Sequence, residues 1–284
     1  MNRTFSFIDN KAILYVVATP IGNLKEFSPR QEEILSLSDY IASEDTRTTK
    51  NLLSKFNISK PMIPCHEHNE VEASNKIISL LKEGKTVSLT SDAGYPGISD
   101  PGEKLIKRVI EERIPVSIIN GSSAFVPALI GSGLSTNHFY FHGFLPSKKG
   151  ERRKELTSIK DYPMTMIFYE SPHRIIETLN DMYEILGDRN VSLAREITKM
   201  YEEYIRGTLK EFTTLNKDSL LGEMVIVIEG KKETTTLNEE ELIKIIKTRL
   251  SKNDISKKDL AKEIADIYSL KKNDVYKLIL DNLD

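Results

Sequence analysis

Cysteine is almost absent from this 284-residue chain, which contains only Cys65. A single thiol excludes an intrachain disulfide framework and a zinc site built from several cysteines. No run of 18 or more apolar residues occurs, so the sequence predicts no membrane-spanning helix. The first residues include Asp9 and lack the apolar segment of a secretory signal, so we expect a cytoplasmic protein.

An excess of positive charge is also missing, because 40 Lys and Arg face 42 Asp and Glu, for a net charge of −2. This balance excludes a polycationic coat for nucleic acid, so any basic surface must be local. The charged fraction of 29% and the hydrophobic fraction of 39% are ordinary for a globular chain. At roughly 100–200 residues per domain, the length predicts about two domains.

Short apolar runs alternate with helix-like runs in the first half of the chain. The predicted strands span 13–19, 40–45, 61–67, 86–92, 115–120 and 138–144. This alternation predicts an α/β fold with a mostly parallel sheet that helices cover on both faces. Ligands bind beyond the carboxyl ends of the strands in such sheets, so function is expected in the loops that follow strands.

The composition changes at the basic segment LPSKKGERRKEL, residues 145–156. A second α/β pattern follows it, then the polar linker KKETTT and three short helix patterns. We therefore predict an α/β domain over 1–145, a second α/β domain over 146–232 and a small helical domain over 233–284.

The segment SDAGYPGISDPG, residues 91–102, joins a predicted strand to a predicted helix. It is longer than the 2–6 residues usual for such loops, and two prolines stiffen it. Gly94 and Gly97 would let main-chain N–H groups face a ligand, and Asp92 could accept hydrogen bonds from a ribose or an amine. We interpret the loop as ligand-binding, although Asp100 also fits the N-cap of the next helix. The loop matches neither the Walker A nor the GxGxxG pattern.

Charged residues follow other predicted strands. Glu44, Asp45 and Arg47 either bind a ligand or simply cap and pair at the start of a helix. His66 and His68 share a strand face, but zinc usually needs three or four ligands, so a polar loop edge is favoured over a metal site.

The second domain has two similar strand ends, in FYESPHR and AREITK. Glu170 and Arg174 stand four residues apart, so a salt bridge at a helix start explains them without function. Arg195 and Lys199 follow the next strand, and the two strand ends form either a shared polar cleft or a solvated rim. The basic residues Lys148, Lys149, Arg152 and Arg153 either contact phosphates or form a solvated helix face.

Seven motifs stand in a fixed order: ATPIGNL, SEDTRTT, HEHNE, SDAGYPGISDPG, GSSA, FYESPHR and AREITK. In these motifs the chain resembles the ribosomal RNA small-subunit methyltransferase I family of the tetrapyrrole methylase superfamily. The resemblance runs from about Ile13 to Gly230, and the helical tail matches the family's helix-turn-helix-like C-terminal domain. Cys65 stands where the family commonly has an aromatic residue.

The resemblance implies transfer of a methyl group from S-adenosylmethionine to the ribose 2′-hydroxyl of a cytidine in the decoding region of small-subunit (16S) ribosomal RNA. It implies two α/β domains with the cofactor in the cleft between them, usually in a homodimer. Carried over to this chain, the implied cofactor contacts are Pro20, Asp92, Ala93, Gly94, Pro96, Gly97, Ile98, Ser122, Ser123, Tyr169, Ala194 and Met224.

Methyl transfer from a sulfonium needs approach geometry and exclusion of water, and it needs no metal. A ribose hydroxyl is a poor nucleophile, so a base or a cation near it should help. Glu170 is the candidate base, and Lys199, Arg195 and Arg47 are the candidate cations.

Two other interpretations stay open. A methyltransferase of the same superfamily could act on a tetrapyrrole or another small molecule, which would require neither the helical tail nor the basic junction. A non-catalytic ribosome-binding protein could retain the fold, but the intact polar strand ends argue against it.

Overall fold

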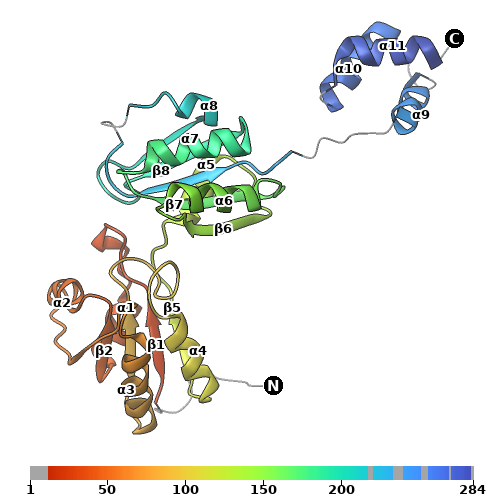
Figure 1. Ribbon diagram of the computed structural model, residues 1–284. Helices are drawn as coiled ribbons and strands as arrows, with labels where there is room; N and C mark the ends of the chain where they lie inside the picture. The colour runs from red at the N-terminus through yellow and green to blue at the C-terminus, as the bar shows by residue number, and fades with distance from the viewer. Residues whose placement is uncertain (1–11, 217–219, 233–238, 251–254, 269, 283–284) are drawn as a thin grey trace. The chain divides into compact units, whose positions relative to one another are not determined.

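The computed structural model describes residues 12–216, 220–232, 239–250, 255–268 and 270–282. The chain divides into two compact units, residues 1–231 and 232–284. The described part of the larger unit contains two five-stranded sheets, and that of the smaller unit contains three helices (Figure 1). The expected linker KKETTT lies mostly outside the described residues.

The first sheet has the strand order β3-β2-β4-β1-β5, and every pairing in it is parallel. Its strands are β1 (Leu14–Val17), β2 (Tyr40–Ser43), β3 (Met62–Pro64), β4 (Val87–Thr90) and β5 (Val116–Ile119). The parallel sheet expected from the alternating pattern is thus confirmed. Because all strands run in one direction, the loops that follow them gather at one edge of the sheet.

Helices cover both faces of this sheet. They are α1 (Pro29–Leu37), α2 (Thr46–Ser54), α3 (Glu70–Lys82) and α4 (Glu103–Glu111). Alternate residues of a strand point to opposite faces. Leu14 and Val16 therefore pack in the apolar cluster with α3 and α4, and Val17 packs in the cluster with α1 and α2.

The start of α1 shows how local sequence fixes an element. Ser28 and Gln31 form a capping box: the Ser28 hydroxyl accepts the Gln31 N–H at 3.3 Å, and Gln31 Oε1 accepts the Ser28 N–H at 2.6 Å. Pro29 occupies the first helical position, where its missing N–H costs no hydrogen bond.

The second sheet has the strand order β6-β7-β10-β8-β9. Its strands are β6 (Phe139–Phe144), β7 (Thr165–Glu170), β8 (Asn190–Arg195), β9 (Glu203–Thr208) and β10 (Met224–Ile228). The β6–β7 pair is parallel, whereas β10 runs antiparallel to both β7 and β8. The last strand in sequence is therefore the central strand of the sheet.

This sheet is also covered on both faces. The helices are α5 (Phe125–Ser132), α6 (Lys149–Ile159), α7 (Ile175–Leu186) and the short α8 (Leu209–Phe212). One apolar cluster joins α6, α7 and α8 to the sheet, and another joins α5 to the opposite face.

The strand Phe139–Phe144 differs from our expectation. We placed it in a first domain ending at residue 145, but β6 pairs with β7 and belongs to the second sheet. Helix α5 also packs on β8 and β10. By sheet membership, the change of domain falls between β5 and α5. The sequence placed it later, because an apolar run predicts a strand without predicting which strand it pairs with.

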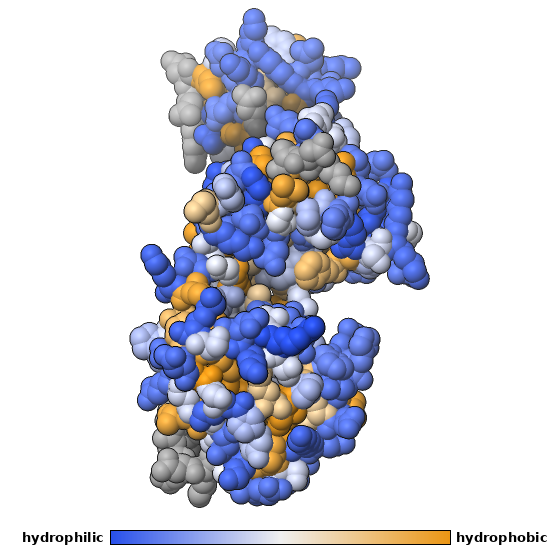
Figure 2. All heavy atoms as spheres, turned by 90° about the vertical axis from the view of Figure 1, so that its left-hand side faces the viewer, coloured by the Kyte–Doolittle hydropathy of each residue, from blue (hydrophilic) through white to orange (hydrophobic). Residues whose placement is uncertain are grey.

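The smaller unit consists of α9 (Glu239–Leu250), α10 (Lys257–Tyr268) and α11 (Lys272–Asn282) around an apolar cluster of their own. No helix in the described residues is long and apolar enough to cross a membrane. Figure 2 shows one face of the molecule, on which hydrophobic residues form separate patches among hydrophilic ones.

Candidate functional site

The glycine-rich loop after β4 is bonded to the loop after β1. The Thr19 N–H donates to the Gly94 carbonyl at 2.8 Å, and the Gly94 N–H donates to the Thr19 carbonyl at 3.0 Å. The Thr19 hydroxyl also donates to the Ser91 carbonyl at 3.1 Å. Since β1 and β4 are neighbours, these bonds hold both loops together at the carboxyl edge of the first sheet.

Two glycines of this loop have different roles. Gly94 has a φ of +78°, which favours glycine, and a Cβ there would meet only ordinary contacts such as Ile21 Cγ2 at 3.7 Å. Gly97 also has a positive φ, but a Cβ there would face Glu103 at the start of α4. The Gly94 N–H donates to the Thr19 carbonyl and the Gly97 N–H donates to the Pro101 carbonyl. We expected both N–H groups to face a ligand, and these bonds correct that expectation.

Glu70, from the neighbouring helix α3, caps the helix that follows the loop. Its Oε1 accepts the N–H groups of Gly102, Lys104 and Leu105 at 3.2, 3.0 and 3.3 Å. Glu70 is 5% exposed, so its carboxylate is held in place at the amino end of α4. This cap replaces the one we considered for Asp100.

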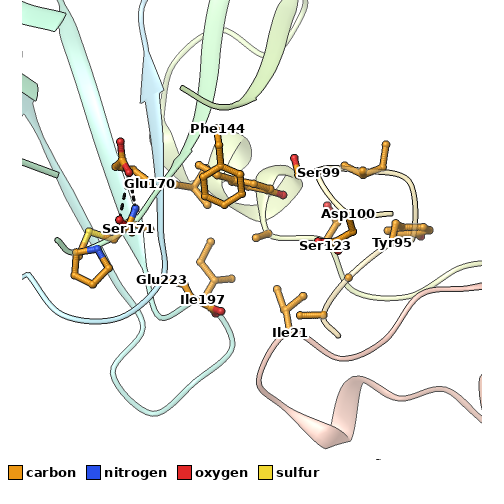
Figure 3. A pocket seen from close by; sticks show the side chains of 18 residues that line it. Ile21, Tyr95, Ser99, Asp100, Ser123, Phe144, Glu170, Ser171, Ile197 and Glu223 are labelled. Carbon is orange, nitrogen blue, oxygen red and sulfur yellow. Dashed lines mark hydrogen bonds between the residues drawn. The ribbon is translucent and has the colours of Figure 1, made fainter. Parts of the chain in front are cut away.

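A cavity of about 300 Å³ lies beside the glycine-rich loop. Its walls come from the loops of both sheets. Figure 3 shows Ile21, Tyr95 and Asp100 on one side of it, with Phe144 and Glu170 on the other.

The charged residues that line this cavity are all acidic. Among the described residues that line it, the charged ones are Asp100, Glu170 and Glu223, and none is Lys, Arg or His. Burial, together with the nearby carboxylates of Glu44 and Asp92, raises the pKa of Asp100 to about 6. Burial likewise raises the pKa of both neighbours. Arg174 pairs with Glu170 and Lys199 with Glu223, so the crowded carboxylates of Asp100, Glu44 and Asp92 are the part of the site that favours a cationic ligand.

The opposite wall is aromatic. The ring of Phe144 meets that of Tyr169 edge-on, with centroids 5.4 Å apart, and Phe141 meets Tyr169 at 5.2 Å. Burial raises the pKa of Tyr169 to about 12, so its phenol stays neutral. The cavity thus combines an apolar wall with an acidic one.

The carboxylate of Glu170 is fully engaged within the second domain. It accepts the Ser171 N–H at 2.8 Å, Arg174 Nη2 at 2.8 Å and the Thr178 hydroxyl at 2.6 Å. Its side chain is 0% exposed. These bonds match the structural alternative, in which the Glu170–Arg174 pair stabilises the start of α7.

The three candidate cations do not line this cavity. Arg47 is 88% exposed and pairs with Asp45 at 2.9 Å. The remaining two are bound by carboxylates near the end of β8: Arg195 by Glu203, and Lys199 by Glu196 and Glu223. Of the four side chains considered as a base or a cation for the ribose hydroxyl, only Glu170 belongs to the cavity wall.

The expected cofactor contacts divide evenly. Six line the cavity: Ala93, Gly94, Ile98, Ser123, Tyr169 and Met224. The other six do not, namely Pro20, Asp92, Pro96, Gly97, Ser122 and Ala194.

A second cavity, of about 430 Å³, shares Ile21, Ser123 and Ile197 with the first. Ser122 lines it, and its hydroxyl donates to Glu26 at 2.7 Å. The GSSA turn therefore stands between two adjoining cavities.

The basic run divides into exposed and buried members. Lys148 and Lys149 are exposed at the start of α6. Arg152 is 1% exposed and bonds Asp181 at 2.8 Å between α6 and α7, so our expectation that it meets phosphates is corrected. Arg153 also bonds Asp181, at 2.7 Å. These two arginines hold the helices together.

His66 and His68 have ring centroids 6.1 Å apart. In the described residues, no three His, Cys, Asp or Glu side chains form a group that could hold a metal ion.

Several cavity residues were not singled out from the sequence as contacts, among them Ile21, Phe144, Ile197 and Glu223. Ile21 stands inside the TPIGN turn, where its position after a strand was a usable signal. The others come from the second domain, and no local pattern indicates that their loops close the same cavity.

A family model described as Tetrapyrrole (Corrin/Porphyrin) Methylases matches residues 13–213. Solved structures share the fold. The methyltransferase CobJ superposes with a TM-score of 0.57 at 17% identity, over 78% of this chain and 94% of that one. Uroporphyrin-III-C-methyltransferase from Thermus thermophilus gives 0.54 at 15% identity, over 77% and 94%.

Closer relatives are named ribosomal RNA small subunit methyltransferase I. The protein of Halalkalibacterium halodurans is 49% identical over 79% of this chain and 78% of its own length. Those of Bacillus subtilis and Haemophilus influenzae are 41% and 40% identical, over 96% and 97% of this chain and 96% and 99% of their own. The chain belongs to the tetrapyrrole methylase family and, within it, to the group of ribosomal RNA small subunit methyltransferase I proteins.

Proposed function

We propose that this protein transfers the methyl group of S-adenosylmethionine to the ribose 2′-hydroxyl of a cytidine in the decoding region of small-subunit ribosomal RNA. One observation carries the proposal: the chain matches proteins named for small-subunit RNA methylation over nearly the full length of both.

The cavity fits this cofactor. When bound, S-adenosylmethionine supplies an electrophilic methyl group on a positively charged sulfur. Asp100 provides negative charge that favours a sulfonium or an ammonium group, whereas Glu223 is paired with Lys199. Phe144 and Tyr169 provide an apolar wall for the uncharged parts, and the space beside Gly94 leaves room for the ligand.

The residues of this chain would act mainly by positioning. Burial of the cavity wall excludes water, which strengthens electrostatic contacts within it. Glu170 keeps the start of α7 in place through its bonds to Arg174 and Thr178.

The proposed roles of Arg47, Arg195, Lys199 and Glu170 in hydroxyl attack have a direct kinetic test. General acid–base help is typically worth about 10²–10⁴-fold. Single-turnover methylation by Lys199→Met and Glu170→Gln would show a loss of that order if either group assisted the hydroxyl. Near wild-type rates would leave catalysis to positioning alone.

We place the RNA contact at the exposed lysines of α6. Lys148 and Lys149 follow the cavity residue Phe144 by four and five positions, so phosphates bound there would lie near the cavity. Lys154 is also exposed on this helix. The helical unit 232–284 is a second proposed contact, and a substrate in the ribosome places the enzyme in the cytoplasm.

We also propose a homodimer. Val126 and Ile130 stand four residues apart on α5 and are 43% and 70% exposed, and nearby Phe139 is 44% exposed. Exposed apolar residues on one helix face are typical of a protein interface. Ile130→Glu should convert a dimer to a monomer in light scattering.

The function is tested by incubating the purified chain with S-adenosylmethionine and small subunits from a strain that lacks this gene. Nuclease digestion and mass spectrometry should find a 2′-O-methylcytidine that appears only with the enzyme. The proposal would be contradicted if the enzyme methylated a tetrapyrrole and left the ribosomal RNA unmethylated.

A further inference from the structure

The loop between β8 and β9, residues 196–202, presents two apolar side chains to solvent. Met200 is 89% exposed and Tyr201 is 71% exposed, the two largest exposed fractions among the large hydrophobic residues that the structure describes. Burying them against a partner would remove apolar surface from water, so their exposure needs an explanation.

The loop is held firmly. The Glu202 N–H donates to the Lys199 carbonyl at 3.2 Å, which makes Met200 and Tyr201 the two central residues of a β-turn. The Thr198 N–H donates to Glu202 Oε2 at 2.6 Å. Glu196 and Thr198 adopt φ values of +49° and +70°, which are uncommon for residues other than glycine and often occur at functional sites.

The loop is also tied to the cavity wall. Lys199 Nζ bonds Glu196 Oε1 at 3.0 Å and Glu223 Oε2 at 3.1 Å, and Glu223 lines the first cavity. Ile197 lines both cavities, and Figure 3 shows it beside Glu223. The turn that carries Tyr201 therefore belongs to the rim of the proposed reaction site.

The charges around the turn indicate which part of an RNA it can meet. Four carboxylates, those of Glu196, Glu202, Glu203 and Glu223, stand in or beside the loop, and among the described residues the cations that pair with them are two, Arg195 and Lys199. The surplus of negative charge disfavours phosphates. The face of an unpaired base carries no such charge and stacks on aromatic rings. A base is thus the part of the substrate that suits this tip.

We infer that the 196–202 loop recognises the substrate, with Tyr201 stacking on an unpaired base of the RNA beside the methylation site and Met200 packing against the same base or its neighbour. This inference rests on the proposed function. It assigns the base contact to this turn and leaves the phosphates to the lysines of α6.

The first test compares Tyr201→Ala with Tyr201→Phe, which keeps the ring and removes only the hydroxyl. Stacking of one base on an aromatic ring is worth about 1–3 kcal/mol, which corresponds to about 5- to 140-fold in affinity. Tyr201→Ala should raise the KM for small subunits by such a factor, and Tyr201→Phe should keep it. S-adenosylmethionine affinity, measured by calorimetry, should be unchanged in both.

A matched control is Leu37→Ala, which removes an apolar side chain that is 67% exposed at the end of α1. The KM should not change in this variant. The inference is overturned if Tyr201→Ala keeps the wild-type KM, or if both Tyr201 variants raise it equally. Methylation by the wild-type chain, measured first, separates this failure from failure of the proposed function.

A second test uses the absence of tryptophan from the chain. Tyr201→Trp places a single indole at the tip, and stacking on a base should quench its fluorescence when small subunits are added. Leu37→Trp provides the control indole and should not respond. An unresponsive Trp at position 201 under conditions where the subunit binds would also overturn the inference.

Discussion

The side chain of Lys199 lies against Gly22: a Cβ atom added at Gly22 would stand 2.6 Å from Lys199 Cγ and 2.7 Å from its Cε. Gly22 follows β1 in the first domain, and Lys199 follows β8 in the second. Because Lys199 Nζ is also bonded to Glu196 and Glu223, one side chain connects the loops of both sheets at the cavity.

Substituting Gly22→Ala should weaken S-adenosylmethionine binding, because the new Cβ would displace Lys199 and because φ at this position is +145°. In a Lys199→Ala background the collision disappears, so Gly22→Ala should reduce the affinity for S-adenosylmethionine by less than it does in the wild type. Residues in contact typically show coupling energies of about 0.5–3 kcal/mol. Calorimetry on the four proteins measures this coupling, and simple additivity of the two losses would contradict the contact.

Substituting Asp100→Asn should lower S-adenosylmethionine affinity about 10- to 100-fold at pH 7.5, the range expected for a lost hydrogen bond or contact to a charged group. Since the pKa of Asp100 is raised to about 6, wild-type affinity should increase as the pH rises through 6. The variant should lose this dependence. Calorimetry at pH 5.5 and pH 7.5 tests both, and an equal pH response in the two proteins would exclude Asp100 as its source.

The same carboxyl group should affect the stability of the ligand-free protein. Its ordinary pKa is 3.8, so between about pH 4 and pH 6 the native state holds a proton that the unfolded chain has released. The contribution of Asp100 to the free energy of unfolding should therefore decrease as pH rises through this window. Urea unfolding should show the free energy of Asp100→Asn rising relative to that of wild type between pH 4 and pH 6.

Replacing Glu70→Ala should lower the free energy of unfolding by about 1–3 kcal/mol, because three N–H groups at the start of α4 lose their acceptor. It should also weaken S-adenosylmethionine binding, since the loop before α4 carries Asp100. Glu72→Ala, an exposed position in the same helix turn, is the control and should change neither quantity. Equal effects of the two substitutions would argue against the cap.

Substitutions of Arg152 and Lys149, two members of the basic run at α6, should differ in their effect on stability. Arg152→Ala leaves Asp181 without one of its buried partners, and breaking a buried ion pair costs about 3–5 kcal/mol, less here because Arg153 still bonds Asp181. Lys149→Ala should leave stability within about 0.5 kcal/mol, because exposed substitutions seldom do more.

Binding to RNA should depend on Lys149 and not on Arg152, the opposite of the effects on stability. Lys149→Ala should weaken binding to small subunits and flatten its salt dependence, since it removes a proposed phosphate contact. Urea unfolding and filter binding at several salt concentrations give both readouts. An unchanged salt slope would return Lys149 to the alternative of a solvated helix face, and an unstable Lys149→Ala variant would contradict its separation from Arg152.

The sequence was most informative where structure is local. Apolar runs predicted the strands of the first sheet, and the length of the 91–102 loop indicated a ligand site. The buried place of Arg152 was also readable, since Leu156 and Ile159 lie four and seven positions later on the buried face of α6. The run of basic residues, taken alone, suggested instead that Arg152 is exposed to solvent.

What local patterns could not supply were the contacts between distant segments. Glu70 caps a helix that begins more than 30 residues later. The cavity closes only when the loop after β4 meets the segment before β10, which contributes Glu223. Such pairings depend on the tertiary fold, and no spacing in the sequence encodes them directly.

The central place of β10 in the second sheet has a consequence for how the enzyme is made. Chains emerge from the ribosome amino end first, and strands that pair across long separations form late. The first sheet is complete at Ile119, but β7 and β8 each lack a neighbour until Met224–Ile228 has been synthesised. We therefore expect nascent chains that end before Met224 to be open to proteases at the second sheet. The cofactor cavity, which also needs Glu223 and Met224, can form only once most of the larger unit has left the exit tunnel.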